Sequence, residues 1–86
     1  MDEIQARLVR CFENVFPALP AEEIPRSSTK TNSAWDSVAA ITLVNVIEDE
    51  FGFQMDFDRL PELDSFDRVL TYVKTELQGS RLDSIG

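Results

Sequence analysis

Three serines in this chain stand between an aspartate and an apolar residue, in Asp36-Ser37-Val38, Asp64-Ser65-Phe66 and Asp83-Ser84-Ile85. A serine hydroxyl can carry a covalent group, but Asp-Ser is also an ordinary cap for the first turn of a helix. Ser84 is too close to the end of the sequence to open a helix, and Ser65 has no long loop before it. Only Ser37 follows a long irregular segment and begins the most apolar helical pattern. Ser37 is therefore the serine that its sequence context singles out.

The rest of the composition argues against catalysis by the chain itself. The sequence contains no histidine, so it lacks the usual base of a Ser-His-acid hydrolase and the commonest ligand of zinc. A calcium loop that started at Asp56 would have Asp58 in the right place, but Leu60 and Pro61 stand where a ligand and a glycine are needed. We expect no catalytic residues, no metal site and no autonomous enzyme.

The charge of the chain predicts the kind of partner. The 86 residues carry a net charge of −8, which opposes binding to nucleic acids and to anionic membranes and favours basic protein partners. Between Thr31 and Asp67 there are nine acids and one base, Arg59. No apolar run approaches the ~18 residues that a membrane span needs, and the acidic start differs from a signal peptide. We expect a monomeric cytoplasmic protein, and the start at Met1 favours a free-standing one.

Apolar spacing predicts an all-α fold. In the central stretch Ala40, Leu43, Ile47 and Phe51 recur at steps of three and four residues, the period of an α-helix. The lone Cys11 fits the apolar stripe of a first helix and is expected to be a core residue. The expected segments are a helix over 2–16, a loop over 17–34, the central helix over 35–51, a short helical turn within 53–63, and a last helix from 66 to a stop at Gly79.

This pattern predicts a small bundle of three main helices plus one short helix, with a long first loop. Residues 1–78 form one domain on this prediction, and 79–86 form a loose C-terminal tail. The expected core takes one stripe from each helix and consists of Leu8, Phe12, Val15, Leu43, Ile47, Phe51, Leu63, Val69 and Val73. A second stripe on the central helix, Val38, Ile41 and Val44, is expected to be exposed beside Ser37 as a docking surface. Its expected acidic rim is Glu48, Asp49, Asp56 and Asp58.

These motifs resemble the acyl carrier protein family. Trp35-Asp36-Ser37-Val38 is similar to the family's D-S-L motif with valine in place of leucine, and Glu48 to Gly52 and Phe66 to Val73 continue the likeness. The resemblance extends from about residue 2 to 77. It implies that Ser37, with Asp36 in the same motif, carries 4′-phosphopantetheine, whose thiol holds acyl intermediates as thioesters. It also implies an acyl pocket near Ile47, Met55, Leu60 and Leu63.

The resemblance further implies partners, namely a phosphopantetheinyl transferase and separate acyl-processing enzymes with basic surfaces. Many fatty-acid carriers have acids in the first turns of the central helix, where this chain has Ala39, Ala40 and Thr42. A specialised pathway for polyketide, lipopeptide or modified-lipid assembly is therefore expected at least as much as fatty-acid biosynthesis. Two alternatives stay open. One is an aminoacyl or peptidyl carrier, although Ser33 to Asp36 lacks that signature's glycines, and the other is an unmodified acidic helical protein-interaction domain.

Overall fold

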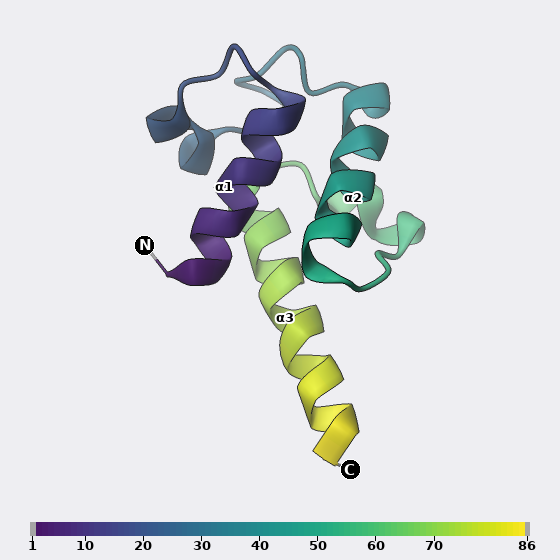
Figure 1. The fold of residues 1–86 in the computed structure, drawn as a ribbon. Coiled ribbons are helices and arrows are strands. Elements are labelled where there is room, and N and C mark those ends of the chain that lie inside the picture. The colour runs from purple at the N-terminus through teal and green to yellow at the C-terminus, as the bar shows by residue number, and fades with distance from the viewer. Residues whose placement is uncertain (1, 86) are drawn as a thin grey trace.

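The computed structural model describes the backbone of residues 2–85 and the side chains of residues 2–78, and these form an all-helical bundle (Figure 1). Within this part of the chain, β pairing is limited to one antiparallel bridge between Ser28 and Ser65. The expected all-α fold of three main helices is confirmed, with two short helices where one was expected. The elements are α1 (Glu3–Val15), the 3-10 helix η1 (Ala21–Arg26), α2 (Ser37–Phe51), the 3-10 helix η2 (Phe57–Glu62) and α3 (Phe66–Ile85).

Side chains and a glycine fix the ends of these helices. The carboxylate of Asp2 accepts a hydrogen bond of 2.7 Å from the amide of Gln5 and caps α1. Gly52 follows α2 with a φ of 75°, in the left-handed region that favours glycine, and its amide bonds to the last turn. The hydroxyl of Ser65 accepts from the amide of Arg68 at 3.2 Å and caps α3. The main helices therefore begin where local sequence dictates.

An aromatic cluster fills the centre of the bundle. Phe12 of α1 packs against Phe66 of α3 and against Trp35, with ring centroids 5.0 and 5.3 Å apart. Phe16 contacts the same Trp35 at 5.9 Å. Such aromatic pairs stabilise a core beyond the area that they bury. Trp35 directly precedes the cap of α2, so the cluster fixes where α2 begins.

Most of the expected core is buried, but its edges differ from the prediction. Val15 and Phe51 are half-buried rather than buried, because they lie in the last turns of their helices at the periphery of the bundle. Cys11 is buried as expected. The other buried apolar residues outside the nine of the expected core are Val9, Phe16, Ile24, Trp35, Val44, Met55, Phe66 and Tyr72.

The prediction that Val44 is exposed is wrong. Val44 is 3% exposed, whereas Val38 is 73% and Ile41 47% exposed. Each residue of an α-helix is rotated by about 100° from the one before, so Val44 lies only about 60° from Ile47, which faces the core. The covered part of α2 is wide enough to include it. The exposed strip therefore consists of Val38 and Ile41.

The last helix does not stop at Gly79. The backbone of α3 stays helical to Ile85 and extends beyond the other helices (Figure 1), so the predicted helix end is wrong. One glycine lowers helix stability by only about 1 kcal/mol, which a long helix can tolerate. The division into a domain of 1–78 and a loose tail of 79–86 stays a prediction, and Gly86 lies outside the described residues.

The long first loop is ordered by contacts with the start of α3. The amide of Thr29 donates to the carbonyl of Asp64 at 2.9 Å, and the amide of Phe66 donates to the carbonyl of Ser27 at 3.0 Å. Ser27 is itself buried, and its hydroxyl donates to the carbonyl of Ile24 at 2.7 Å. These bonds satisfy backbone groups that a buried loop would otherwise leave unpaired. The loop is therefore a fixed support for the residues that follow it.

Two ion pairs join α1 to its neighbours. Arg7 pairs with the carboxylate of Glu50 at 2.7 Å, and its guanidinium lies 4.6 Å from the ring centre of Phe51. Lys74 of α3 pairs with Asp2 at 2.8 Å, and this hydrogen bond holds the pKa of the Asp2 carboxyl below its usual range. Pairs this exposed contribute little stability each, but they fix the relative positions of three helices.

Candidate functional site

Ser37 is the first residue of α2, and its side chain is exposed. The preceding Asp36 makes the cap: its carboxylate accepts from the amide of Ala39 at 2.9 Å, and its carbonyl accepts from the amide of Ala40 at 2.9 Å. Because Asp36 satisfies these two amides, the helix does not need the Ser37 hydroxyl as a cap. The side chain of Ser37 is thus presented at a helix start that another residue stabilises.

The approach to Ser37 is held by a compact turn. The amide of Trp35 donates to the carbonyl of Asn32 at 3.0 Å, and the side-chain oxygen of Asn32 accepts from the amide of Ala34 at 3.1 Å. Trp35 is 5% exposed and sits in the aromatic cluster. Because Ser37 follows Trp35 by two residues, the packing of Trp35 also fixes the position of Ser37.

An open cleft of about 510 Å³ lies beside Ser37, between the start of α2 and η2. Its volume is within the usual range for small-molecule sites. Phe57 forms part of the far wall and is 55% exposed, although it is a large apolar side chain. Sequence reasoning missed Phe57, which alternates with Asp56 and Asp58 in an acidic segment and was hidden by that charge. The residues that line the cleft are Thr29, Trp35, Asp36, Ser37, Ala40, Phe57, Leu60, Pro61, Leu63 and Asp64.

The four residues expected to form an acyl pocket do lie together. Ile47, Met55, Leu60 and Leu63 line one interior cavity, but its volume is only about 10 Å³, close to the minimum that one water molecule needs. Leu60 and Leu63 also line the open cleft, as do Trp35 and Ala40. The cleft and the cavity are therefore neighbours, and the side chains that they share separate them.

The residues expected to form a docking surface are only partly brought together. Val38 and Ile41 are exposed next to Ser37, and Asp49 is exposed near the end of the same helix. Val44 faces the core. Glu48 is half-buried, and its carboxylate accepts a hydrogen bond of 2.8 Å from the amide of Met55. Glu48 therefore has an internal structural contact as well as a charge.

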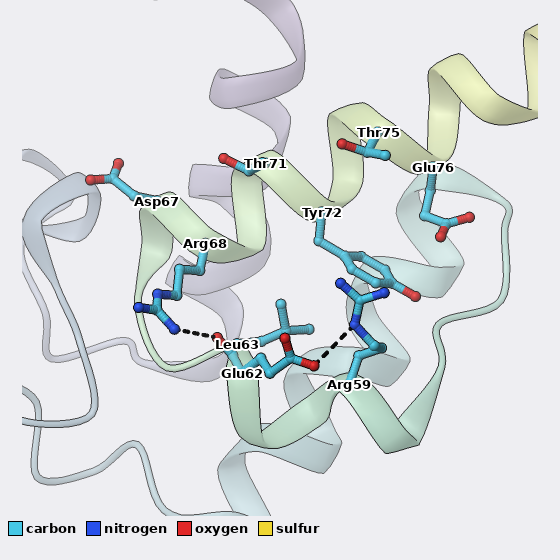
Figure 2. Close-up of a pocket in the computed structure, with 9 residues that line it drawn as sticks. All are labelled: Arg59, Glu62, Leu63, Asp67, Arg68, Thr71, Tyr72, Thr75 and Glu76. Atoms are coloured by element: carbon cyan, nitrogen blue, oxygen red, sulfur yellow. Dashed lines mark hydrogen bonds and ion pairs between the residues drawn. The ribbon is translucent and has the colours of Figure 1, made fainter.

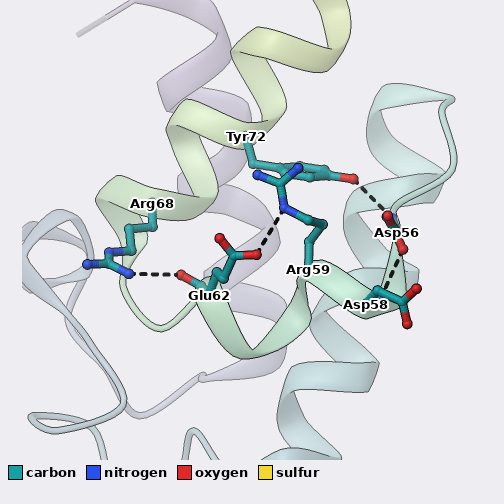
Figure 3. A network of polar contacts seen from close by, with 6 residues as sticks. All are labelled: Asp56, Asp58, Arg59, Glu62, Arg68 and Tyr72. Carbon is teal, nitrogen blue, oxygen red and sulfur yellow. Dashed lines mark hydrogen bonds and ion pairs between the residues drawn. The ribbon is translucent and has the colours of Figure 1, made fainter.

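Asp56 and Asp58, the other expected members of the acidic rim, lie where η2 begins. Both are exposed, and the Asp56 carboxylate accepts from the amide of Asp58 at 2.9 Å, which caps η2. Figure 3 shows this bond together with the contacts that follow along η2. The rim is thus divided between the C-terminal end of α2 and the N-terminal end of η2.

A second groove, of about 340 Å³, lies between η2 and α3 (Figure 2). Ser37 does not line it. Three of its charged residues contact one another: Arg59 pairs with Glu62 at 3.1 Å, and Arg68 donates to the carbonyl of Glu62 at 3.4 Å. Because these groups already satisfy one another and lie away from the candidate serine, the cleft at Ser37 is the stronger candidate site.

The side chain of Cys11 cannot serve as a reactive thiol at this site. Cys11 is 2% exposed, and burial raises the pKa of its thiol to about 11, with a further contribution from the charge of Glu50. A thiol with this pKa is almost fully protonated near neutral pH and is a poor nucleophile.

The described residues contain neither a candidate metal cluster nor a candidate membrane span. No group of three or more cysteine, aspartate or glutamate side chains within this part of the chain could hold a metal ion. None of the described helices has the length and apolar character needed to span a bilayer.

Comparison with known proteins identifies one family. Residues 6–73 match the family described as phosphopantetheine attachment site. This range includes Ser37 and both walls of the cleft beside it. No curated protein and no solved structure gives a significant match.

Proposed function

The chain belongs to the phosphopantetheine attachment site family and is therefore a non-catalytic carrier domain, and we propose that Ser37 is the serine to which the arm is attached. The observation that carries this proposal is that Ser37 is exposed at the mouth of the cleft while Asp36 makes the cap. The competing Ser65 is half-buried, and its hydroxyl is used to cap α3. Ser84 lies outside the residues whose side chains are described.

The start of α2 suits a phosphodiester on Ser37. The amides of Ser37 and Val38 precede the first bonded turn, and the positive end of the helix dipole lies at the same place. Asp36 positions these groups by holding Ala39 and Ala40 in helical geometry. Phosphopantetheine supplies a flexible arm whose terminal thiol holds cargo as a thioester, and the apolar wall of the cleft gives such a cargo a surface to contact.

We further propose that the cargo is an acyl group. The family includes carriers of acyl and of aminoacyl or peptidyl groups, and the apolar side chains of Phe57, Leu60 and Pro61 favour the first. Ile47 and Met55 line the adjoining cavity with Leu60 and Leu63, and we propose these four as an inner acyl pocket that is closed at rest and admits a chain only when η2 moves outward. The carrier would serve fatty-acid biosynthesis or a specialised polyketide, lipopeptide or modified-lipid pathway.

The docking surface that we propose consists of Val38 and Ile41, with acids from the ends of α2 and η2 as its rim. The exposed apolar pair offers area to bury, and the rim attracts partners with basic surfaces, such as a phosphopantetheinyl transferase and acyl-processing enzymes. Val44 is no longer part of this surface. The acids of the rim are Glu48, Asp49, Asp56 and Asp58.

Intact mass after coexpression with a phosphopantetheinyl transferase tests the proposal. We expect wild type and Ser65→Ala to gain the mass of one phosphopantetheine group, and Ser37→Ala to gain none. Because Ser37 does not make the cap, Ser37→Ala should change the free energy of unfolding by no more than about 0.5 kcal/mol. Attachment to Ser65 in peptide mapping would overturn the site. An unmodified wild-type protein would favour the alternative of an acidic protein-interaction domain.

A further inference from the structure

The segment that connects α2 to η2, residues 53–56, is bound by side chains from two different helices. The amide of Met55 donates to the carboxylate of Glu48 in α2 at 2.8 Å. The next amide, that of Asp56, donates to the hydroxyl of Tyr72 in α3 at 2.9 Å (Figure 3). Two consecutive backbone groups therefore fix this connecting segment against both α2 and α3.

These bonds are partly shielded from water. Tyr72 is 8% exposed and Glu48 is half-buried, so both acceptors lie in surroundings where hydrogen bonds are stronger than in bulk solvent. The guanidinium of Arg59 lies 5.8 Å from the ring centre of Tyr72 and covers that side chain from the η2 side (Figures 2 and 3). Outward movement of η2 has to disrupt this arrangement.

The same connecting segment closes the interior cavity. Met55 is 6% exposed and forms one wall, and Ile47 forms another on the continuous helix α2. Trp35, at the boundary with the cleft, is fixed by its contacts with Phe12 and Phe16. The movable wall is therefore the connecting segment with η2. A chain can enter the 10 Å³ cavity only if that wall moves, whereas the 510 Å³ cleft is already open at Ser37.

We propose that this carrier keeps a short acyl cargo in the open cleft, against Phe57, Leu60 and Pro61, and that Glu48 and Tyr72 determine this by holding the cavity closed. A longer chain then extends past the cleft into solvent instead of entering the cavity. This inference rests on the proposed function, since Ser37 must bear the arm. Glu48 and Tyr72 are positioning residues that act through the connecting segment.

Thioester cleavage by hydroxylamine tests where the cargo lies. Wild-type protein is loaded with butyryl or dodecanoyl phosphopantetheine by a transferase, and the cleavage rates of the two thioesters are compared. We expect equal rates, because neither thioester is withdrawn into the interior. In Tyr72→Phe and Glu48→Ala, dodecanoyl should be cleaved up to about twofold more slowly than butyryl, because the loss of one hydrogen bond raises the small population with an open cavity about fivefold. Slow cleavage of dodecanoyl in wild type would overturn the proposal.

Two matched variants separate positioning from charge and from general destabilisation. Glu48→Gln keeps an acceptor for the amide of Met55 and should behave as wild type. Glu13→Ala removes the same charge from an exposed position of α1 outside the docking surface and should also show no dependence on chain length. A destabilised fold would accelerate cleavage of both thioesters alike. If Tyr72→Phe and Glu48→Ala gave that result, or no dependence on chain length, the proposed role of these residues would be wrong.

Xenon binding to the unmodified protein tests the closed cavity without any arm. Xenon enters dry apolar cavities, and the methyl NMR signals of Ile47 and Leu63 report its presence. We expect larger xenon-induced shifts in Tyr72→Phe than in wild type, and equal shifts would contradict closure by these contacts. If the transferase left the wild-type protein unmodified, the proposed function would fail, and the xenon titration would still decide how the cavity is closed.

Discussion

The two sides of η2 differ in what they offer a ligand. Toward α2, Phe57 and Leu60 line the open cleft at Ser37 with apolar surface. Toward α3, Arg59 and Glu62 line a groove and pair with each other (Figure 2). Covering exposed apolar surface with a ligand lowers the free energy of the complex. Covering charges that are already paired removes their hydration and gives them no new partner, which opposes binding. The cleft at Ser37 is therefore suited to an apolar ligand, and the groove at α3 is not.

The geometry of a 3-10 helix explains this division. Side chains three residues apart are eclipsed, so Phe57 aligns with Leu60 on one side and Arg59 aligns with Glu62 on the other. A six-residue helix can thus present an apolar ridge and a charged ridge, and Leu60 of the apolar ridge also packs against the core. The comparison predicts that substitutions on the two sides have unequal effects.

The largest expected difference is in stability. Ile47, behind the apolar side, is 1% exposed, and Ile47→Ala should lower the free energy of unfolding by about 2–5 kcal/mol. Arg59→Ala, on the charged side, removes an ion pair whose side chains are more than half exposed and should cost at most about 1 kcal/mol. Urea unfolding measures both. Equal losses would show that the charged side supports the fold as much as the apolar side.

The next difference concerns docking. Ile41→Glu places a charge in the exposed strip beside Ser37, and we expect the kcat/KM of a phosphopantetheinyl transferase to fall about tenfold, as for an interface residue worth more than 1 kcal/mol. Thr71→Glu adds the same charge at an exposed position in the α3 groove and should leave kcat/KM unchanged. A larger effect from Thr71→Glu would move the docking surface to the charged side.

A thiol titration extends the comparison to the interior. The folded protein raises the pKa of Cys11 to about 11, so folding favours the protonated thiol and the unfolded chain loses its proton first. The contribution to stability is complete below the ordinary thiol pKa of about 8.5 and is lost as pH rises from there to about 11. We expect a loss of about 1 kcal/mol per pH unit, measured by urea unfolding. A Cys11→Ala variant with the same slope would exclude Cys11 as the cause.

The smallest expected effect is that of salt. Nine acids and one base between Thr31 and Asp67 crowd negative charge on this part of the chain, and the repulsion destabilises the compact state. Salt at ~0.1 M should raise the melting temperature by a few degrees through screening. Magnesium or calcium should raise it further at matched ionic strength by bridging carboxylates. Identical melting temperatures in sodium and calcium would contradict bridging by divalent cations. A melting temperature that does not depend on salt would contradict the proposed repulsion between the acids.

Local signals in the sequence were sufficient to predict the central helix and the place of Ser37 at its start. Asp36 and Gly52 mark the ends of α2 through contacts within a few residues, and the apolar steps of Leu43 and Ile47 set its buried side. The burial of Val44 could not be predicted in this way. Its angle on the helix leaves it at the edge of the buried side, and the segments that cover it are distant in sequence.

The rest of the candidate site depends on distant contacts too. Phe57 is assigned to the cleft only when η2 packs beside Ser37, and the hydrogen bond from Asp56 to Tyr72 joins residues with no shared local pattern. The acids of the rim were recognised from composition, but composition could not show that Glu48 binds the amide of Met55.

The bridge between Ser28 and Ser65 determines when, during synthesis of the chain, Ser37 can be modified. The loop that supports Ser37 is completed by the start of α3, so a nascent chain contains the serine long before it contains the contacts that position it. Closing so wide a loop is a late and entropically costly step of folding. We therefore expect that chains truncated before Asp64 are not modified, and that a transferase in the cell acts only on carriers whose synthesis has passed this point. Modification of such a truncated chain would disprove this order of events.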